Sequence, residues 1–102
     1  MIHVIAIITA KPGQRDRILE EARANLAAVR AEKGCIEYGP AIDAMGFSFQ
    51  TDAGPDTFFV IEKWADADAL KAHAVAPHMA AYGKKVKDLI AKRVIHVLES
   101  AE

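Results

Sequence analysis

The stretch TFFVIEKW, residues 57–64, decides the fold of this chain because it reads as a strand that is apolar on both sides. Side chains along a strand point alternately to opposite faces, so Phe58, Glu62 and Trp64 share one face. The other face carries Phe59 and further apolar residues. Since both faces are mostly apolar, the stretch is predicted to lie inside a sheet that is covered on both sides.

A helix is predicted to begin directly after this strand. Asp66 is a good N-cap residue, and Asp68 adds negative charge at the positive end of the helix. This helix carries His73, and the break at Pro77 starts a second helix. The strand and the two helices are therefore expected to bring together a candidate site that consists of Glu62, Trp64, His73, His78 and Tyr82.

Length and composition predict one compact domain that spans residues 1–102. Of these residues 52% are hydrophobic, and the 13 basic and 14 acidic side chains are interspersed, so nucleic acid is not expected as a partner. The single Cys35 excludes an intramolecular disulfide and suits a reducing compartment. The apolar run from Ile2 to Ala10 lacks a basic segment and is too short to span a bilayer, so we expect a cytoplasmic protein without a membrane partner.

Before this strand, the chain predicts a strand, a helix and a second strand. Residues 2–9 are β-branched and apolar at nearly every position, which indicates a central strand. From about Arg15 apolar residues follow helical spacing, and Gly34 is predicted to close that helix as its C′ residue. Residues 35–43 alternate in polarity but contain Pro40, which cannot donate a ladder hydrogen bond and therefore indicates an edge strand.

The remaining segments read as turns, a helix and a final strand. Two turns, at residues 44–46 and 52–56, are predicted on either side of Phe47-Ser48-Phe49-Gln50. After Pro77 an apolar stripe that extends to Leu89 and Ile90 predicts a helix whose outer face carries lysines. Residues 94–99 are predicted to form the last strand.

The resulting order is strand, helix, strand, strand, helix, strand. With right-handed crossovers this order predicts an α+β fold, a ferredoxin-like βαββαβ domain whose antiparallel sheet has helices on one face only. The bare face would expose more apolar area than soluble monomers usually do. We therefore expect a homodimer in which two sheets pack face to face and form a dimeric α/β barrel.

Several short motifs carry a family resemblance over the whole chain. They are Pro12-Gly13, Gly34-Cys35 with Tyr38, Phe47-Ser48-Phe49-Gln50, Glu62-x-Trp64, Ala69-Leu70, His73 and Pro77-His78-Met79. In these motifs the chain resembles the antibiotic biosynthesis monooxygenase (ABM) domains, which are small dimeric α/β barrels, and is most similar to the quinol monooxygenases among them.

This resemblance implies a cofactor-independent monooxygenase that oxidises a small aromatic hydroquinone or polyketide-like phenol with molecular oxygen. A deprotonated hydroquinone is itself a one-electron donor to oxygen, so the protein needs only to assist proton removal and to hold the anion in a dry pocket. Some relatives carry an asparagine where this chain has Val60, which argues against a strict anthrone oxygenase mechanism. The iron-ligating histidine of haem-degrading relatives corresponds to Tyr82, so haem is not implied.

Three candidate residues each have a functional and a structural interpretation. Trp64 either stacks on the substrate ring or fills the core. Glu62 is either a base with a raised pKa or a carboxylate satisfied by histidine or backbone donors. His78 either accepts the proton of a hydroquinone or fixes the loop before its helix. These three residues are the predicted catalytic residues.

Four further residues are predicted to bind the substrate: Phe58, His73, Met79 and Tyr82. Tyr82 either hydrogen-bonds a quinol oxygen or belongs to the core. The two histidines are five residues apart across a helix break, which is not the i, i+4 spacing of metal ligands on one helix, and no second carboxylate is seen to complete a set. We therefore expect neither a metal ion nor another cofactor.

Two other functions stay open at this level. One is a non-catalytic dimeric barrel that binds a small hydrophobic ligand, and the other is a sugar-phosphate isomerase of the autoinducer-processing type. A polar cavity with convergent basic groups would favour the isomerase. A dry cavity walled by Phe58, Trp64, Met79 and Tyr82 would favour a quinol as the substrate.

Overall fold

The computed structural model describes all residues, 1–102. In chain order the elements are β1 (Ile2–Ala10), α1 (Arg15–Arg30), β2 (Cys35–Ala41), β3 (Thr57–Trp64), α2 (Ala67–Ala74), α3 (Pro77–Val86), the 3-10 turn η1 (Lys87–Leu89) and β4 (Ile90–Leu98). This order confirms the predicted sequence of strands and helices. The helical segment after β3 is divided just before Pro77, as predicted, and Asp66 caps α2 by accepting a hydrogen bond from the backbone N–H of Ala69 at 2.8 Å.

The strands form one antiparallel sheet with the order β2-β3-β1-β4. This is the ferredoxin-like arrangement, with β1 and β3 in the centre. β2 is an edge strand and contains Pro40, which confirms the prediction from that proline. The register places Glu62 of β3 between Tyr38 of β2 and Val4 of β1, so these three side chains share one face of the sheet.

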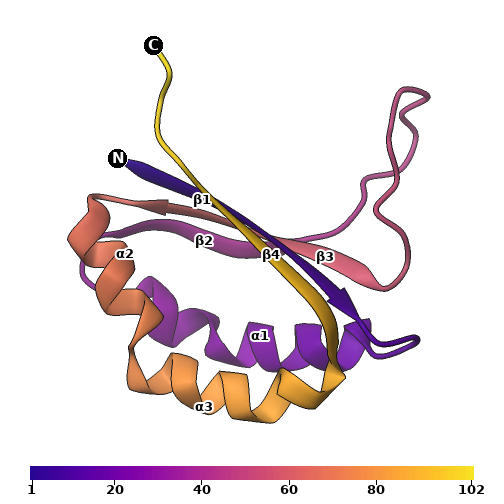
Figure 1. Cartoon of the computed structure of the whole chain (residues 1–102), viewed down its shortest axis with the longest axis horizontal. Coiled ribbons are helices and arrows are strands. Elements are labelled where there is room, and N and C mark those ends of the chain that lie inside the picture. The colour runs from indigo at the N-terminus through magenta and orange to yellow at the C-terminus, as the bar shows by residue number, and fades with distance from the viewer.

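The helices cover one face of the sheet only. Figure 1 shows α1 and α3 next to each other on this side, with α2 at one end. The β3 residues that point toward the helices are buried, and Phe58 and Trp64 are both 0% exposed. Phe58 belongs to the same core cluster as Ile18 and Leu19 of α1, whereas Trp64 belongs to a smaller cluster with Val29. The side chains of β3 therefore point alternately to the helix-covered face and to the uncovered face of the sheet, as the sequence predicted.

The prediction that Gly34 closes α1 is wrong. The helix ends at Arg30 with Ala31 as its C-cap, and Gly34 lies farther on, directly before β2. Its φ of +81° lies in the left-handed region, and a Cβ atom at this position would lie 2.6 Å from the Cβ of Ala69 on α2. Glycine is required here because of a close tertiary approach and not because a helix ends.

Two other boundaries differ from the sequence predictions. The last strand begins at Ile90 rather than Val94, because α3 ends at Val86 and η1 turns the chain into β4. The second strand, predicted over residues 35–43, ends at Ala41, and residues 42–56 contain no strand. Figure 1 shows this connection between β2 and β3 projecting from the body of the domain. None of the helices combines the length and the apolar character that crossing a membrane requires.

Candidate active site

A cavity of about 440 Å³ lies between the sheet and the helices α2 and α3. Its volume is within the range of about 300–1,000 Å³ that is usual for small-molecule sites. Of the 19 lining residues 14 are hydrophobic, so the cavity is mainly apolar. The ionisable lining residues include Glu62 and His73 from β3 and α2, and Arg93 and Lys87 from β4 and η1.

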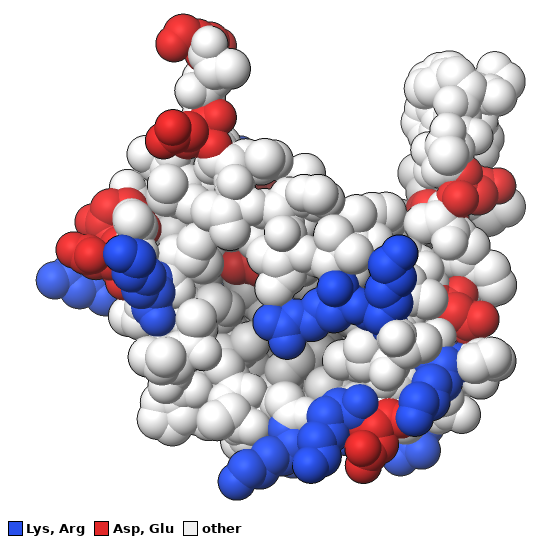
Figure 2. Space-filling view, viewed as in Figure 1, with Lys and Arg blue, Asp and Glu red and all other residues white.

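The cavity opens beside β4. Ile95 and Val97 pair with Ala6 and Val4 of β1, so they face the helix side and line the cavity. They are nevertheless 46% and 57% exposed, because the helices do not extend over this edge of the sheet. Figure 2 shows Lys and Arg side chains gathered across β4 and along α3 on this face of the molecule. A ligand can therefore reach the cavity from the β4 edge, past basic side chains.

Glu62 is the buried carboxylate of this cavity. It is 6% exposed, and its Oε1 accepts a hydrogen bond of 2.9 Å from Trp64 Nε1. Burial raises the pKa of Glu62 above its usual range, and the hydrogen bond from Trp64 offsets only part of this effect. A carboxylate with a raised pKa that faces an apolar cavity is suited to accept a proton from a bound ligand.

Trp64 and Phe58 do not line the cavity. Trp64 packs in the core cluster of Val4 and Val29, and it reaches the site through its hydrogen bond to Glu62 and its contact with the ring of His73, at a centroid distance of 4.6 Å. Phe58 packs against α1. Both side chains are fully buried because α1 packs on the sheet at these two positions. Neither ring therefore has a free face on which a ligand could stack.

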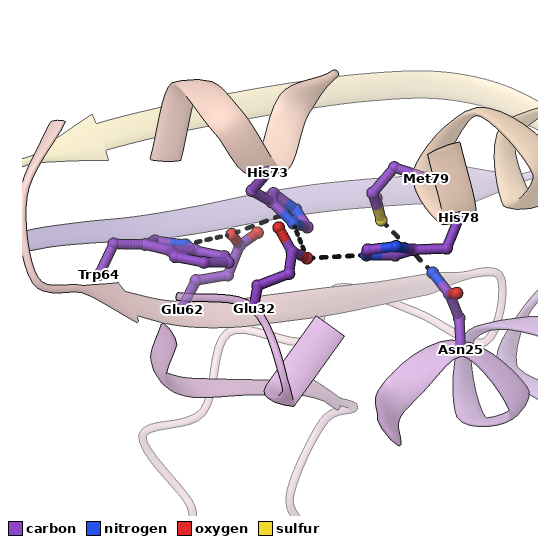
Figure 3. A network of polar contacts seen from close by, with 7 residues as sticks. All are labelled: Asn25, Glu32, Glu62, Trp64, His73, His78 and Met79. Carbon is purple, nitrogen blue, oxygen red and sulfur yellow. Dashed lines mark hydrogen bonds and ion pairs between the residues drawn. The ribbon is translucent and has the colours of Figure 1, made fainter. Parts of the chain in front are cut away.

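Glu32 joins the two predicted site histidines in one polar network. Its Oε2 lies 2.8 Å from His73 Nδ1 and 2.8 Å from His78 Nε2 (Figure 3). On its other side, His73 Nε2 lies 4.0 Å from Glu62 Oε1. His73 is thus placed between two carboxylates, one that faces the cavity and one outside the cavity lining.

His78 lies outside the cavity lining and is bonded to Glu32 rather than to Glu62. It follows Pro77 in the first turn of α3, and its side chain is 27% exposed. The first turn of α3 directs His78 toward the loop after α1, while Met79 turns into the cavity. Of the five residues predicted to surround one cavity, the structure places Glu62, His73 and Tyr82 in its lining.

Met79 and Tyr82, both predicted to bind the substrate, line the cavity from α3. The Sδ atom of Met79 accepts a hydrogen bond of 3.3 Å from the side-chain amide of Asn25, which fixes the thioether against α1. Burial raises the pKa of Tyr82, and the nearby charge of Arg93 opposes this shift. The Tyr82 hydroxyl is therefore a neutral group that can donate a hydrogen bond to a ligand oxygen.

Sequence reasoning missed three residues of this site. Tyr38 lines the cavity, and its position opposite Glu62 follows from the pairing of β2 with β3, so a register prediction would have found it. Arg93 pairs with Ile8, so the register of β4 against β1 would have placed it on the cavity side. Glu32 carries no comparable signal, because the conformation of a loop brings it to His73, which lies 41 positions away along the chain.

Glu32 also supplies the second carboxylate that the sequence did not reveal near the two histidines. The candidate ligand atoms of Glu32, His73 and His78 lie within 4.8 Å of one another. Two ligands of one tetrahedral zinc ion, with bonds of about 2.1 Å, lie about 3.4 Å apart. The 2.8 Å separations from Glu32 to each imidazole are shorter and are typical of hydrogen bonds, so we interpret this cluster as a self-satisfied hydrogen-bonded network.

The family model of the antibiotic biosynthesis monooxygenases matches residues 1–85. The chain is 39% identical over 102 residues to "Probable quinol monooxygenase YgiN" of Escherichia coli K12, with 97% of each chain covered. It is similar to the crystal structure of PA3566 from Pseudomonas aeruginosa, with a TM-score of 0.82 and 30% identity over 99% of this chain and 94% of that one. A conserved protein from Methanosarcina mazei Go1 shares the fold, with a TM-score of 0.83 and 20% identity over 97% of this chain and 91% of that one.

Proposed function

This chain belongs to the antibiotic biosynthesis monooxygenase family, and on that premise we propose that it is a cofactor-independent monooxygenase that oxidises a small aromatic hydroquinone with molecular oxygen. The observation that carries the proposal is the buried carboxylate of Glu62, which faces a mainly apolar cavity large enough for a bicyclic aromatic ring system. The relatedness to a chain named as a quinol monooxygenase supports a quinol as the substrate.

In the proposed reaction, Glu62 takes the proton of one quinol hydroxyl. The O–H bond of the substrate breaks and an O–H bond forms on the carboxylate, which leaves a hydroquinone anion in the cavity. The raised pKa of Glu62 brings its basicity closer to that of the substrate and so assists this transfer. The anion then passes one electron to molecular oxygen, and the semiquinone and superoxide that result combine to form a C–O bond. The hydroperoxide takes up the proton and loses water, which leaves one oxygen atom on the ring as a hydroxyquinone, and the apolar walls limit competing proton transfer from water.

The other polar lining residues fit the anion that this step creates. Arg93 and Lys87 contribute positive charge to the cavity, and the Tyr82 hydroxyl is available as a hydrogen-bond donor. Positive charge and donors that face a developing oxyanion stabilise it relative to the neutral quinol. Glu62 rather than His78 takes the role of the base in this proposal, because Glu62 lines the cavity and His78 does not.

A second candidate function is the binding of a small hydrophobic ligand without chemistry, which the apolar lining also favours. The two candidates differ in what they require of Glu62. Burying a carboxylate costs folding free energy, and a protein that only binds a hydrophobic ligand gains nothing in return. An enzyme that removes a proton from its substrate needs such a carboxylate as its general base. The mainly apolar lining argues against a sugar-phosphate substrate, which needs several convergent polar and basic groups.

Oxygen uptake with a panel of reduced naphthoquinols, corrected for autoxidation, tests this function. The wild-type protein should accelerate uptake, and Glu62→Gln should lower kcat by about 10²-fold or more, the usual scale for the loss of a general base. Glu20→Gln is the matched control, because Glu20 is an exposed carboxylate on α1, away from both the cavity lining and the uncovered sheet face. A lack of protein-dependent uptake with every quinol, or full activity of Glu62→Gln, would overturn the proposal.

We also propose that the active form is a homodimer joined through the uncovered face of the sheet. Ile5, Ile7, Phe59 and Ile61 lie on this face and are only half-buried, because no element of the chain packs on them. Two such faces packed together would give an obligate interface, which buries about 2,000 Å² or more in total.

A further inference from the structure

We propose that Glu32 is a positioning residue, which holds His73 in the tautomer that can take the proton from Glu62. This inference rests on the proposed function and extends it to a side chain outside the cavity. The proposed step is a second proton transfer. The O–H bond formed on Glu62 breaks and an N–H bond forms at His73 Nε2, so that Glu62 is again a carboxylate and His73 becomes an imidazolium.

The hydrogen-bond partners of Glu32 determine where the two imidazole protons lie. An ionised carboxylate only accepts hydrogen bonds, so each ring nitrogen bonded to it carries a hydrogen. Glu32 Oε2 lies 2.8 Å from His73 Nδ1 and 2.8 Å from His78 Nε2 (Figure 3). One carboxylate oxygen therefore places a hydrogen on His73 Nδ1 and one on His78 Nε2, and in the neutral rings these are opposite tautomers.

The Nδ1–H tautomer leaves the Nε2 atom of His73 as an acceptor on the side of Glu62. The distance from this atom to Glu62 Oε1 is 4.0 Å, which a small rotation of the Glu62 side chain or one bridging water closes. After the transfer, the imidazolium lies between two carboxylates, and Glu32 stabilises its charge. The proton is then held next to the cavity, where the oxygen that is being reduced can use it.

The surroundings of His73 hold the ring in this orientation. His73 is 6% exposed, and the centroid of its ring lies 4.6 Å from that of Trp64. The ring of Tyr38 packs against it in an edge-to-face arrangement, with a centroid distance of 5.4 Å. His78 donates the second hydrogen bond to Glu32 and so limits the rotation of that carboxylate. The side chain of Glu32 is itself only 13% exposed, which strengthens its hydrogen bonds relative to those at the surface.

Long-range proton–nitrogen NMR spectra of the histidine rings test this arrangement directly. The chain has 4 histidines, so the variants His3→Gln, His96→Gln and His78→Gln identify three of them and leave His73 intact. In the wild-type protein His73 should be protonated at Nδ1 and His78 at Nε2. The variant Glu32→Gln should lose the fixed pattern of His73. A wild-type His73 that carries a hydrogen at Nε2, alone or together with one at Nδ1, would overturn the proposal.

Kinetics give the second measurement. Glu32→Gln should lower kcat by about 10²-fold with little change in KM, because Glu32 does not line the cavity, and Glu32→Asp should recover part of the loss. The control Glu20→Gln should retain full activity, because Glu20 is exposed on α1 and outside the cavity lining. A Glu32→Gln variant that melts at a lower temperature but keeps its kcat would show a merely structural role. If wild-type protein consumes no oxygen with any quinol, the proposed function fails, and the ring tautomers still decide whether Glu32 positions His73.

Discussion

The close approach of Gly34 to α2 leads to a quantitative prediction about stability. Gly34 has a φ of +81°, and a Cβ atom there would lie 2.6 Å from the Cβ of Ala69. The Gly34 carbonyl also accepts a hydrogen bond of 2.8 Å from the backbone N–H of Ala65, so the loop cannot move away freely. The substitution Gly34→Ala therefore combines backbone strain with a steric clash between the loop after α1 and the start of α2.

Gly13 provides the matched control, because its φ is +78° and nothing lies within 4 Å of the position of a Cβ atom. Left-handed backbone costs a residue with a Cβ about 1–2 kcal/mol, so Gly13→Ala should lower the free energy of unfolding by this amount. Gly34→Ala should cost about 1–3 kcal/mol more, which is the usual range for overpacking. In a domain of this size each kcal/mol corresponds to a Tm change of about 4–8 °C.

Urea and thermal unfolding of the two variants measure the difference. In the double variant Gly34→Ala with Ala69→Gly the steric clash is removed but the backbone strain at residue 34 remains. This variant should therefore regain the stability lost to the clash, minus about 1 kcal/mol that a glycine inside a helix costs. Equal losses of stability in Gly34→Ala and Gly13→Ala would refute the reasoning, because the contact with Ala69 would then be of no consequence.

Three further predictions concern the site and the assembly. Burial raises the pKa of Glu62 above 4.5, so between pH 4.5 and the raised pKa the folded state binds more protons than the unfolded state, and the free energy of unfolding of the wild type should fall as the pH rises through this window. The melting temperature of Glu62→Gln relative to wild type should therefore increase across the window. A difference in melting temperature that does not change with pH would contradict the raised pKa. Trp64→Ala should cost about 3–5 kcal/mol in urea unfolding, and Trp64→Phe about 1–3 kcal/mol because Glu62 loses its donor. A Trp64→Phe variant as stable as the wild type would argue against the hydrogen bond. Light scattering at micromolar concentration should show a dimer, and Ile61→Lys should yield unfolded or aggregated protein; a stable folded monomer in either experiment would be inconsistent with the proposed interface.

The fold was predictable because its strands carry strong local signals. The alternation of β3 and the β-branched residues of β1 distinguish central strands from edges, and Pro40 marks an edge by removing a donor. Gly34 shows the limit of such signals. A glycine after a helical pattern is typical of a C′ residue, but here a contact with α2, which local sequence does not encode, requires the absence of a side chain.

The site was predictable only where the sheet register determines it. Glu62 was placed on the helix-covered face by alternation alone, and Tyr38 follows once β2 and β3 are paired. Whether Trp64 lines a cavity or fills the core depends on how closely α1 packs on the sheet, which the sequence does not show. The network of Glu32 depends on a loop and on the first turn of α3, so neither helical nor strand periodicity reveals it.

The row of β3 side chains that faces the helices has an evolutionary consequence. Glu62 is the one ionisable member of this row, between Val60 and Trp64, and it occupies a site that would otherwise accept a branched aliphatic residue. Replacing such a desolvated carboxylate by leucine, together with Trp64 by phenylalanine so that no indole N–H loses its acceptor, is a change that increases heat resistance at the expense of function. A library selected for heat resistance alone would therefore lose Glu62, whereas one selected for turnover would retain it. Which residue survives at this position would report whether the lineage still uses the cavity.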